Sequence, residues 1–167
     1  MDLAELSSCL SMMPGVFMAI KWLPILANSS VRYSPLSYMI LCIVSMIHHG
    51  YGFYYGRKSM LLLRLDMIMQ NVTCILTTQN NASIFKIITL AIISSQLNIK
   101  RKNDLYIVYG MNSLITAIMT GNNKTILINW FKTLLVFILS VKHKNCIFEF
   151  VFHMMVHNNV ESIWHTI

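Results

Sequence analysis

Long apolar segments follow one another along almost the whole chain, with only short polar breaks between them. A helix needs roughly 17–25 apolar residues to cross about 30 Å of hydrocarbon, and nearly all of these segments have such a length. The pattern therefore predicts an all-α, multi-pass transmembrane bundle of six to seven helices. We place the segments at 9–28, 37–55, 60–78, 83–99, 105–120, 125–141 and 146–167.

The composition agrees with a membrane protein. Of 167 residues, 56% are hydrophobic and 11% charged, and the mean hydropathy is positive, whereas soluble domains of this length are less apolar. The runs are continuously apolar, which argues against a transmembrane barrel, because its strands alternate polar and apolar residues. Breaks of a few residues force neighbouring helices to run antiparallel. We therefore interpret residues 1–167 as one helical-bundle domain in the plasma membrane or an endomembrane.

The net charge of +7 does not indicate a nucleic-acid-binding protein. The thirteen Lys and Arg residues are scattered through the breaks and form no dense patch with interleaved aromatic residues. Basic residues beside apolar segments are typical of membrane proteins, in which they orient the spans. We expect membrane lipids, and no nucleic acid, as partners of the chain.

Ionisable side chains interrupt three of the apolar segments. The second segment contains His48 and His49 in "CIVSMIHHGYG", the third contains Asp66, and the last contains "HMMVHNNVESIWH". A titratable group in hydrocarbon costs a few kcal/mol, so such residues face the bundle interior and are functional candidates. Four of them are spaced by four residues and form a slowly drifting stripe on a helix: His153, His157, Glu161 and His165.

A histidine or glutamate pair four residues apart on one helix can hold a metal ion together with a ligand from another helix. His49 would supply that ligand to a pair in the last segment, with one position of a zinc ion left open for water. Asp66 would orient the ligands or hydrogen-bond the water. The alternative is that the histidines bind no metal, and that the polar residues only join helices through hydrogen bonds.

Three short stretches together resemble a known group of membrane proteins. Ser45 and His49 stand four residues apart in "SMIHH", Asp66 follows in "LLLRLDMIMQ", and the last segment carries "ESIWH". This order and spacing resembles the CREST superfamily of seven-helix membrane proteins, which includes alkaline ceramidases and the progestin and adipoQ receptors. Within it, the greatest likeness is to the myomaker and transmembrane protein 8 family. Those proteins share a Ser-x-x-x-His, an Asp and a final His-x-x-x-His.

The resemblance implies a set of site residues. Matched onto the family motif, the zinc ligands are His49, Glu161 and His165, and the catalytic residues are Asp66 and Ser45. Glu161 stands where the family has the first histidine of its last motif. The chain is also short at its C-terminus relative to that family.

A second interpretation of the last segment stays open. The stretch "HMMVH" supplies the His-x-x-x-His pair literally, as His153 and His157. We favour "ESIWH", because the side chains inside that motif also match those of the family. We then expect Glu161 and His165 to face His49, and the other two histidines to lie toward the membrane edge or in the preceding connection.

The resemblance leads to two functions. Enzymes of the superfamily are zinc-dependent lipid amidases or lipases, in which the metal activates a water and the Asp and Ser assist. The myomaker branch is known for driving membrane fusion between cells. We therefore expect a membrane-fusion-related protein with an intramembrane metal site or, as an alternative, a ceramidase-like lipid hydrolase that depends on zinc. A structural or receptor-like bundle without metal is the third possibility.

Overall fold

The computed structural model describes residues 3–56, 59–77, 99, 104, 107–108, 124–143 and 146–167. Within these ranges the chain is helical apart from turns and contains no strand, so the predicted all-α class is confirmed. The predicted segments 83–99 and 105–120 lie outside the described residues except for a few isolated positions. The helices are α1 Leu3–Ser11, α2 Met13–Ile25, α3 Ser34–Tyr55, α4 Met60–Thr77, α7 Lys124–His143 and α8 Cys146–His165.

Four helices within the described ranges are long and apolar enough to cross a membrane. They are Leu3–Ile25, in which α2 follows directly on α1, and the helices α3, α4 and α7. The helix α8 is 20 residues long, but its acidic, histidine and asparagine side chains make it less apolar. The predicted count of six to seven helices stays a prediction. The first helix begins at Leu3, earlier than expected, which brings Glu5 into the bundle.

Two prolines and a glycine determine where the N-terminal helices begin and end. Pro14 has no backbone N–H to donate to a carbonyl of the preceding turn, so the hydrogen bonding is interrupted at Met12 between α1 and α2. Pro35 lies in the first turn of α3, where an N–H is not needed. The helix α3 ends at Tyr55 and is capped by Gly56, whose φ of 65° is a left-handed conformation that glycine adopts without steric cost.

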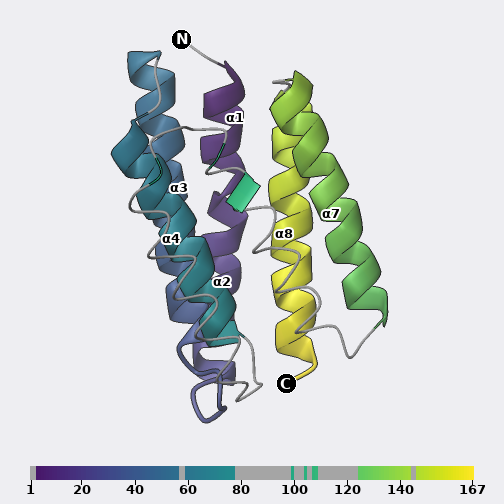
Figure 1. Ribbon diagram of the computed structural model, residues 1–167. Helices are drawn as coiled ribbons and strands as arrows, with labels where there is room; N and C mark the ends of the chain where they lie inside the picture. The colour runs from purple at the N-terminus through teal and green to yellow at the C-terminus, as the bar shows by residue number, and fades with distance from the viewer. Residues whose placement is uncertain are drawn as a thin grey trace.

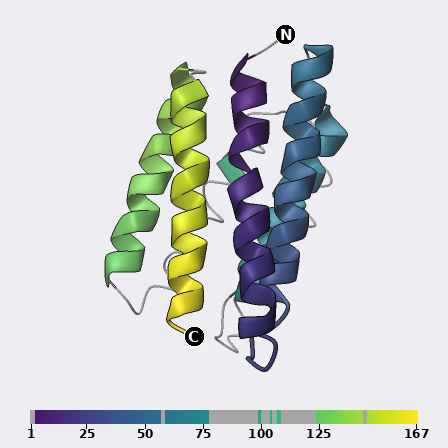
Figure 2. The ribbon, with the colours of Figure 1, turned by 180° about the vertical axis from the view of Figure 1, so that it is seen from behind.

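The helices α1 and α2 lie at the centre of the bundle (Figure 1). They contact α3 on one side and α8 on the other, whereas α4 packs on α3 and α7 packs on α8. Figure 2 shows the same order from behind. The start of α1, the end of α3 and the start of α4 lie at one end of the bundle. The span formed by α1 and α2, then α3 and then α4 therefore run antiparallel to one another in turn, as the short breaks predict.

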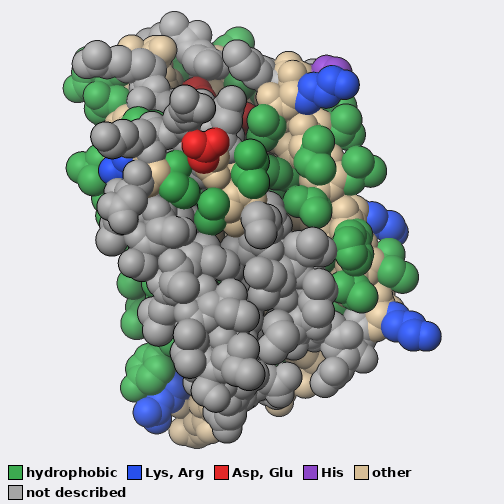
Figure 3. All heavy atoms as spheres, in the orientation of Figure 1, with side chains coloured by type: hydrophobic (Ala, Val, Ile, Leu, Met, Phe, Trp, Pro, Cys, Tyr) green, Lys and Arg blue, Asp and Glu red, His purple; other side chains and the backbone are tan. Residues whose placement is uncertain are grey.

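Hydrophobic side chains cover the outward faces of the helices as well as the core. Figure 3 shows them along the α7 side of the molecule, with a few basic side chains among them. On α7, Phe131, Leu135 and Ile138 are each at least half exposed. The main core lies between α2, α3 and α8, where Ala19 and Trp164 are almost inaccessible. Apolar side chains on both faces are typical of helices that lipid surrounds.

Gly15 allows α2 to approach both α3 and α8. A Cβ atom at this position would lie 2.5 Å from Cε1 of His157 and 2.6 Å from Sγ of Cys42. Both of those side chains are buried. Gly15 and Ala19 also place two small residues one turn apart, a spacing that permits close packing of helices in membranes.

We expect Gly15→Ala to destabilise the bundle by about 1–3 kcal/mol, because the added methyl group overpacks the interface. The measurement is the thermal unfolding midpoint of the protein in detergent. Gly50→Ala is the matched control, since the nearest atom to its Cβ would be Sγ of Cys9 at 3.9 Å, an ordinary van der Waals distance. Equal midpoints for the two variants would contradict the close packing.

Candidate functional site

The site begins with a polar face on α1. Glu5, Ser8 and Ser11 are three residues apart, so their side chains lie on one side of the helix, and all three are buried. This helix contacts both α3 and α8. Because a buried polar group is costly unless it is hydrogen-bonded, the partners of this face lie on the neighbouring helices. Ser8 contacts the carboxylate of Glu149 in the first turn of α8.

Glu5 binds His49 of α3. Oε2 of Glu5 lies 2.8 Å from Nδ1 of His49, and both side chains are buried. Gly52 provides the space for this carboxylate, because a Cβ atom there would lie 3.0 Å from Oε2. A carboxylate accepts hydrogen bonds, so Nδ1 of His49 carries the proton. In the neutral imidazole, Nε2 is then the basic nitrogen.

Ser11 orients His153 of α8 in a similar way. Oγ of Ser11 donates to the carbonyl oxygen of Ser8 at 2.8 Å and lies 2.6 Å from Nδ1 of His153. A hydroxyl has a single proton, so Ser11 accepts from Nδ1, and Nε2 of His153 is assigned as the basic nitrogen. The rings of His49 and His153 are neighbours, with centroids 5.6 Å apart in an edge-on arrangement.

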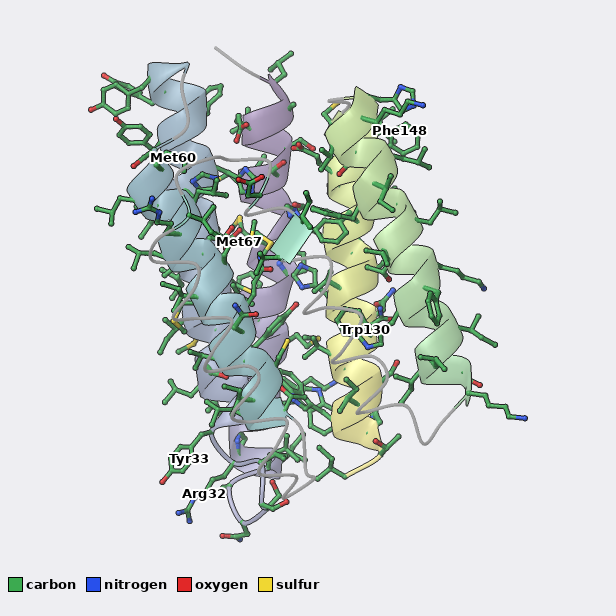
Figure 4. The ribbon with its side chains drawn as sticks, in the orientation of Figure 1. Arg32, Tyr33, Met60, Met67, Trp130 and Phe148 are labelled. Atoms are coloured by element: carbon green, nitrogen blue, oxygen red, sulfur yellow. The ribbon has the colours of Figure 1, made fainter. Side chains whose placement is uncertain are left out.

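A cavity of about 60 Å³ lies beside these two rings and is termed the polar cavity. In Figure 4, Met67, one of its lining residues, extends from α4 toward the centre of the bundle. Three imidazoles and two carboxylates from α3, α4 and α8 therefore share one small space, a donor set suited to zinc. The ionisable residues on its wall are His48, His49, Asp66, Glu149 and His153.

The donor set fits a metal ion in its chemistry. In the described parts of the chain, no three His, Cys, Asp or Glu side chains are already grouped closely enough to hold an ion. His49 and His153 nevertheless meet two requirements of zinc ligands, because Nδ1 is bound to an acceptor that orients the ring and Nε2 is then the basic nitrogen of the neutral form. These two rings therefore have the orientation that a zinc ligand would need.

Glu161 and His165, which the motif suggests as ligands, have other partners. Oε1 of Glu161 accepts a hydrogen bond from Nε1 of Trp22 at 3.1 Å and lies 3.2 Å from Nζ of Lys21. His165 is exposed and packs edge-on against Trp22, with ring centroids 4.7 Å apart. Both side chains therefore contact Trp22 of α2.

The expected register of the last helix is corrected by these contacts. His153, and not His165, is the residue of α8 that meets His49. His165 lies three turns further along the helix, a separation of about 18 Å. The structure does not bring His49, Glu161 and His165 together. His153 is buried inside the bundle, whereas we expected it toward the membrane edge or in the preceding connection.

Both ring nitrogens of His157 form hydrogen bonds within the bundle. Its Nε2 lies 2.8 Å from the carbonyl oxygen of Ser11, so this nitrogen carries the proton. Its Nδ1 then accepts from the hydroxyl of Tyr38 at 2.6 Å. Both nitrogens are engaged, and ligation by His157 would break a buried hydrogen bond. Of the literal pair His153 and His157, only the first reaches the polar cavity.

The two predicted catalytic residues lie at different places. Asp66 is buried and lines the polar cavity together with His49. Ser45 is also buried, but it lines a second cavity of about 60 Å³, which is termed the apolar cavity. Ser45 is therefore beside the predicted group and not in it. Three residues line both cavities: Gln70, Phe152 and His153.

Sequence reasoning missed Glu5, Ser11 and Glu149 as site residues. A first span at 9–28 leaves Glu5 outside the bundle, so its charge is not weighed as an interior group. The signal was nevertheless present, since polar residues at intervals of three mark one face of an otherwise apolar helix. Glu149 likewise stands one turn before His153 and extends the same stripe of α8.

Comparison with known proteins gives no match to a protein-family model, to a curated protein or to a solved structure. The likeness to the CREST superfamily therefore rests on motif order and spacing alone and stays a prediction. What the site does has to be argued from its own geometry.

The hydrogen-bond directions predict the tautomers of three histidines. Nitrogen-15 spectra of histidine-labelled protein at alkaline pH should show the proton on Nδ1 for His49 and His153 and on Nε2 for His157. Single substitutions of each histidine assign the signals. Ser11→Ala should disturb the tautomer of His153 and leave that of His49 unchanged. A His153 ring with its proton on Nε2 would contradict the assignment.

Proposed function

We propose that this chain is a multi-pass membrane protein that binds zinc in the polar cavity and hydrolyses an amide or ester bond of a lipid. The observation that carries the proposal is the pair of oriented imidazoles, His49 and His153, on a cavity that Asp66 also lines. The membrane-fusion role that the family resemblance implies stays a prediction, because no contact between the described helices bears on it.

Three helices supply the ligands in this proposal. His49 of α3 and His153 of α8 bind the ion through Nε2, and Asp66 of α4 binds it through its carboxylate. Glu5 and Ser11 act on the first two, because their bonds to Nδ1 leave Nε2 as the nitrogen that can face the ion and fix the orientation of the rings. This ligand set replaces Glu161 and His165 of the family match by residues that line one cavity.

The chemistry divides between the ion and the chain. When bound, zinc supplies Lewis acidity that polarises an acyl carbonyl and makes water easier to deprotonate. Glu149 lines the same cavity, with Ser8 on its carboxylate, and can take the proton of the attacking water and deliver it to the leaving group. Phe137 and Phe152 on the wall exclude bulk water, which strengthens the electrostatic interactions of these groups.

One observation favours a second candidate, a structural polar seam without metal. Glu5 and His49, Ser11 and His153, and Tyr38 and His157 already form hydrogen-bonded pairs across helices. Such pairs hold helices together in an apolar environment without any further role. Metal content and catalysis distinguish this candidate from the hydrolase.

Protein purified in mild detergent without chelator should contain stoichiometric zinc by elemental analysis. His49→Ala and His153→Ala should each lose the metal, because each removes one proposed ligand. Glu161→Gln and His165→Ala should retain it, since Trp22 and Lys21 hold those side chains elsewhere.

The variants separate three outcomes of this measurement. Loss of zinc in His165→Ala but not in His153→Ala would support the family match and overturn the ligand set proposed above. Absence of zinc from the wild type would support the structural seam. His143→Ala, at the exposed end of α7, is the control for a histidine outside the bundle interior.

Replacement of the proposed general base gives a test of catalysis that leaves the metal in place. Glu149→Gln should lower kcat for hydrolysis of amide or ester lipids by about 10²- to 10⁴-fold, the usual contribution of such a base. Its zinc content should equal that of the wild type. Glu161→Gln makes the same chemical change on the same helix and should leave kcat unaltered. Equal kcat values for both variants would remove Glu149 from the mechanism.

A further inference from the structure

Three buried polar atoms on the wall of the apolar cavity have no hydrogen-bond partner among the described residues. They are Oε1 of Gln70, Oγ1 of Thr73 and Nε1 of Trp130. Thr73 is 4% exposed and Trp130 is 8% exposed, so solvent does not satisfy them from outside. Folded proteins rarely leave such atoms unpaired, and each instance requires an explanation such as a ligand or a water.

The three atoms belong to two helices that line the same cavity. Gln70 and Thr73 are three residues apart on α4, so they lie on one face of that helix. Trp130 comes from α7 and lies between α7 and α8 in Figure 4, where it also packs against Ile163.

The hydrogen-bonding capacities of these atoms define the chemical group that fits them. Nε1 of Trp130 only donates, Oε1 of Gln70 only accepts, and the hydroxyl of Thr73 does both. A hydroxyl group matches all three in kind, because it has one proton and two lone pairs. A carbonyl or ether has no proton for Gln70. A carboxylate or an ammonium would bring a charge that no Asp, Glu, Lys or Arg side chain described on this wall neutralises.

The rest of the wall is predominantly hydrophobic and suits a hydrocarbon body. Leu41, Phe152, Val156 and Val160 are among its lining residues. The helices α4 and α7, which carry the three polar atoms, are both apolar enough to lie in a membrane. A cavity between helices of this kind would lie at the depth of the hydrocarbon, where a membrane-dissolved molecule is found.

We propose that the apolar cavity binds a membrane-soluble alcohol, with its hydroxyl group on Gln70, Thr73 and Trp130 and its hydrocarbon chain against the apolar wall. This site requires neither zinc nor hydrolysis, so it goes beyond the function proposed above. A water molecule bound to the same three atoms is the competing explanation. The alcohol explanation predicts that the cavity binds an alkyl chain that carries a hydroxyl group, and the water explanation does not.

The test compares dodecanol with dodecane, which has the same chain and no hydroxyl. Protein in lipid nanodiscs should bind radiolabelled dodecanol saturably and should not bind dodecane. Thr73→Val keeps the shape of the side chain and removes the hydroxyl, and Gln70→Met removes the amide oxygen. Each should weaken dodecanol binding about tenfold through the loss of one hydrogen bond.

Controls keep the test independent of folding and of zinc. Neither substitution should lower the thermal midpoint of the ligand-free protein, because each removes an unpaired buried atom. Thr166→Val makes the same exchange at an exposed position and should bind dodecanol as the wild type does. His49→Ala should also bind it normally, whatever its zinc content.

Two results would overturn the proposal. Equal binding of dodecane and dodecanol would show that the cavity does not recognise a hydroxyl. Wild-type affinity for dodecanol in both Thr73→Val and Gln70→Met would show that water alone occupies the polar atoms. If one variant fails to fold, the other still decides between an alcohol and water.

Discussion

A polar side chain inside an apolar bundle can find its hydrogen bonds only on other parts of the protein, and this requirement decides which helices meet here. The first helix presents Glu5, Ser8 and Ser11 on one face. Their partners are His49 on α3 and Glu149 and His153 on α8. These contacts place α1 between two helices that are far apart in the sequence. The helix α2 continues α1 and packs its apolar side chains between the same two helices.

The features that sequence predicted well are local ones. The all-α class and the helices α3, α4 and α7 follow from the length of uninterrupted apolar runs, because the hydrocarbon thickness sets that length. The burial of His49 and Asp66 follows from the cost of placing a titratable group against lipid. These conclusions need no knowledge of which helix lies beside which.

The features that sequence missed depend on long-range register. The stripe of α8 contains five polar positions at equal spacing, and spacing alone does not show which of them lies level with His49. Contacts with α1 and α2 decide the matter, since Ser11 binds His153 while Trp22 binds Glu161. The protonation states of the interior histidines are equally invisible in the sequence. A carboxylate, a hydroxyl or a carbonyl beside Nδ1 or Nε2 determines whether a ring can act as a ligand.

The pairing of α1 with α8 has a consequence for how the protein is made. Glu149 is translated 141 residues after Ser8, an interval on the order of ten seconds at ordinary rates of synthesis. During that time His49 of α3 can engage Glu5, but Ser8 and Ser11 of α1 have no final partner on α8. Until then the hydroxyls of Ser8 and Ser11 have only carbonyl oxygens of α1 as partners, and the bundle closes only when its last described helix has been made.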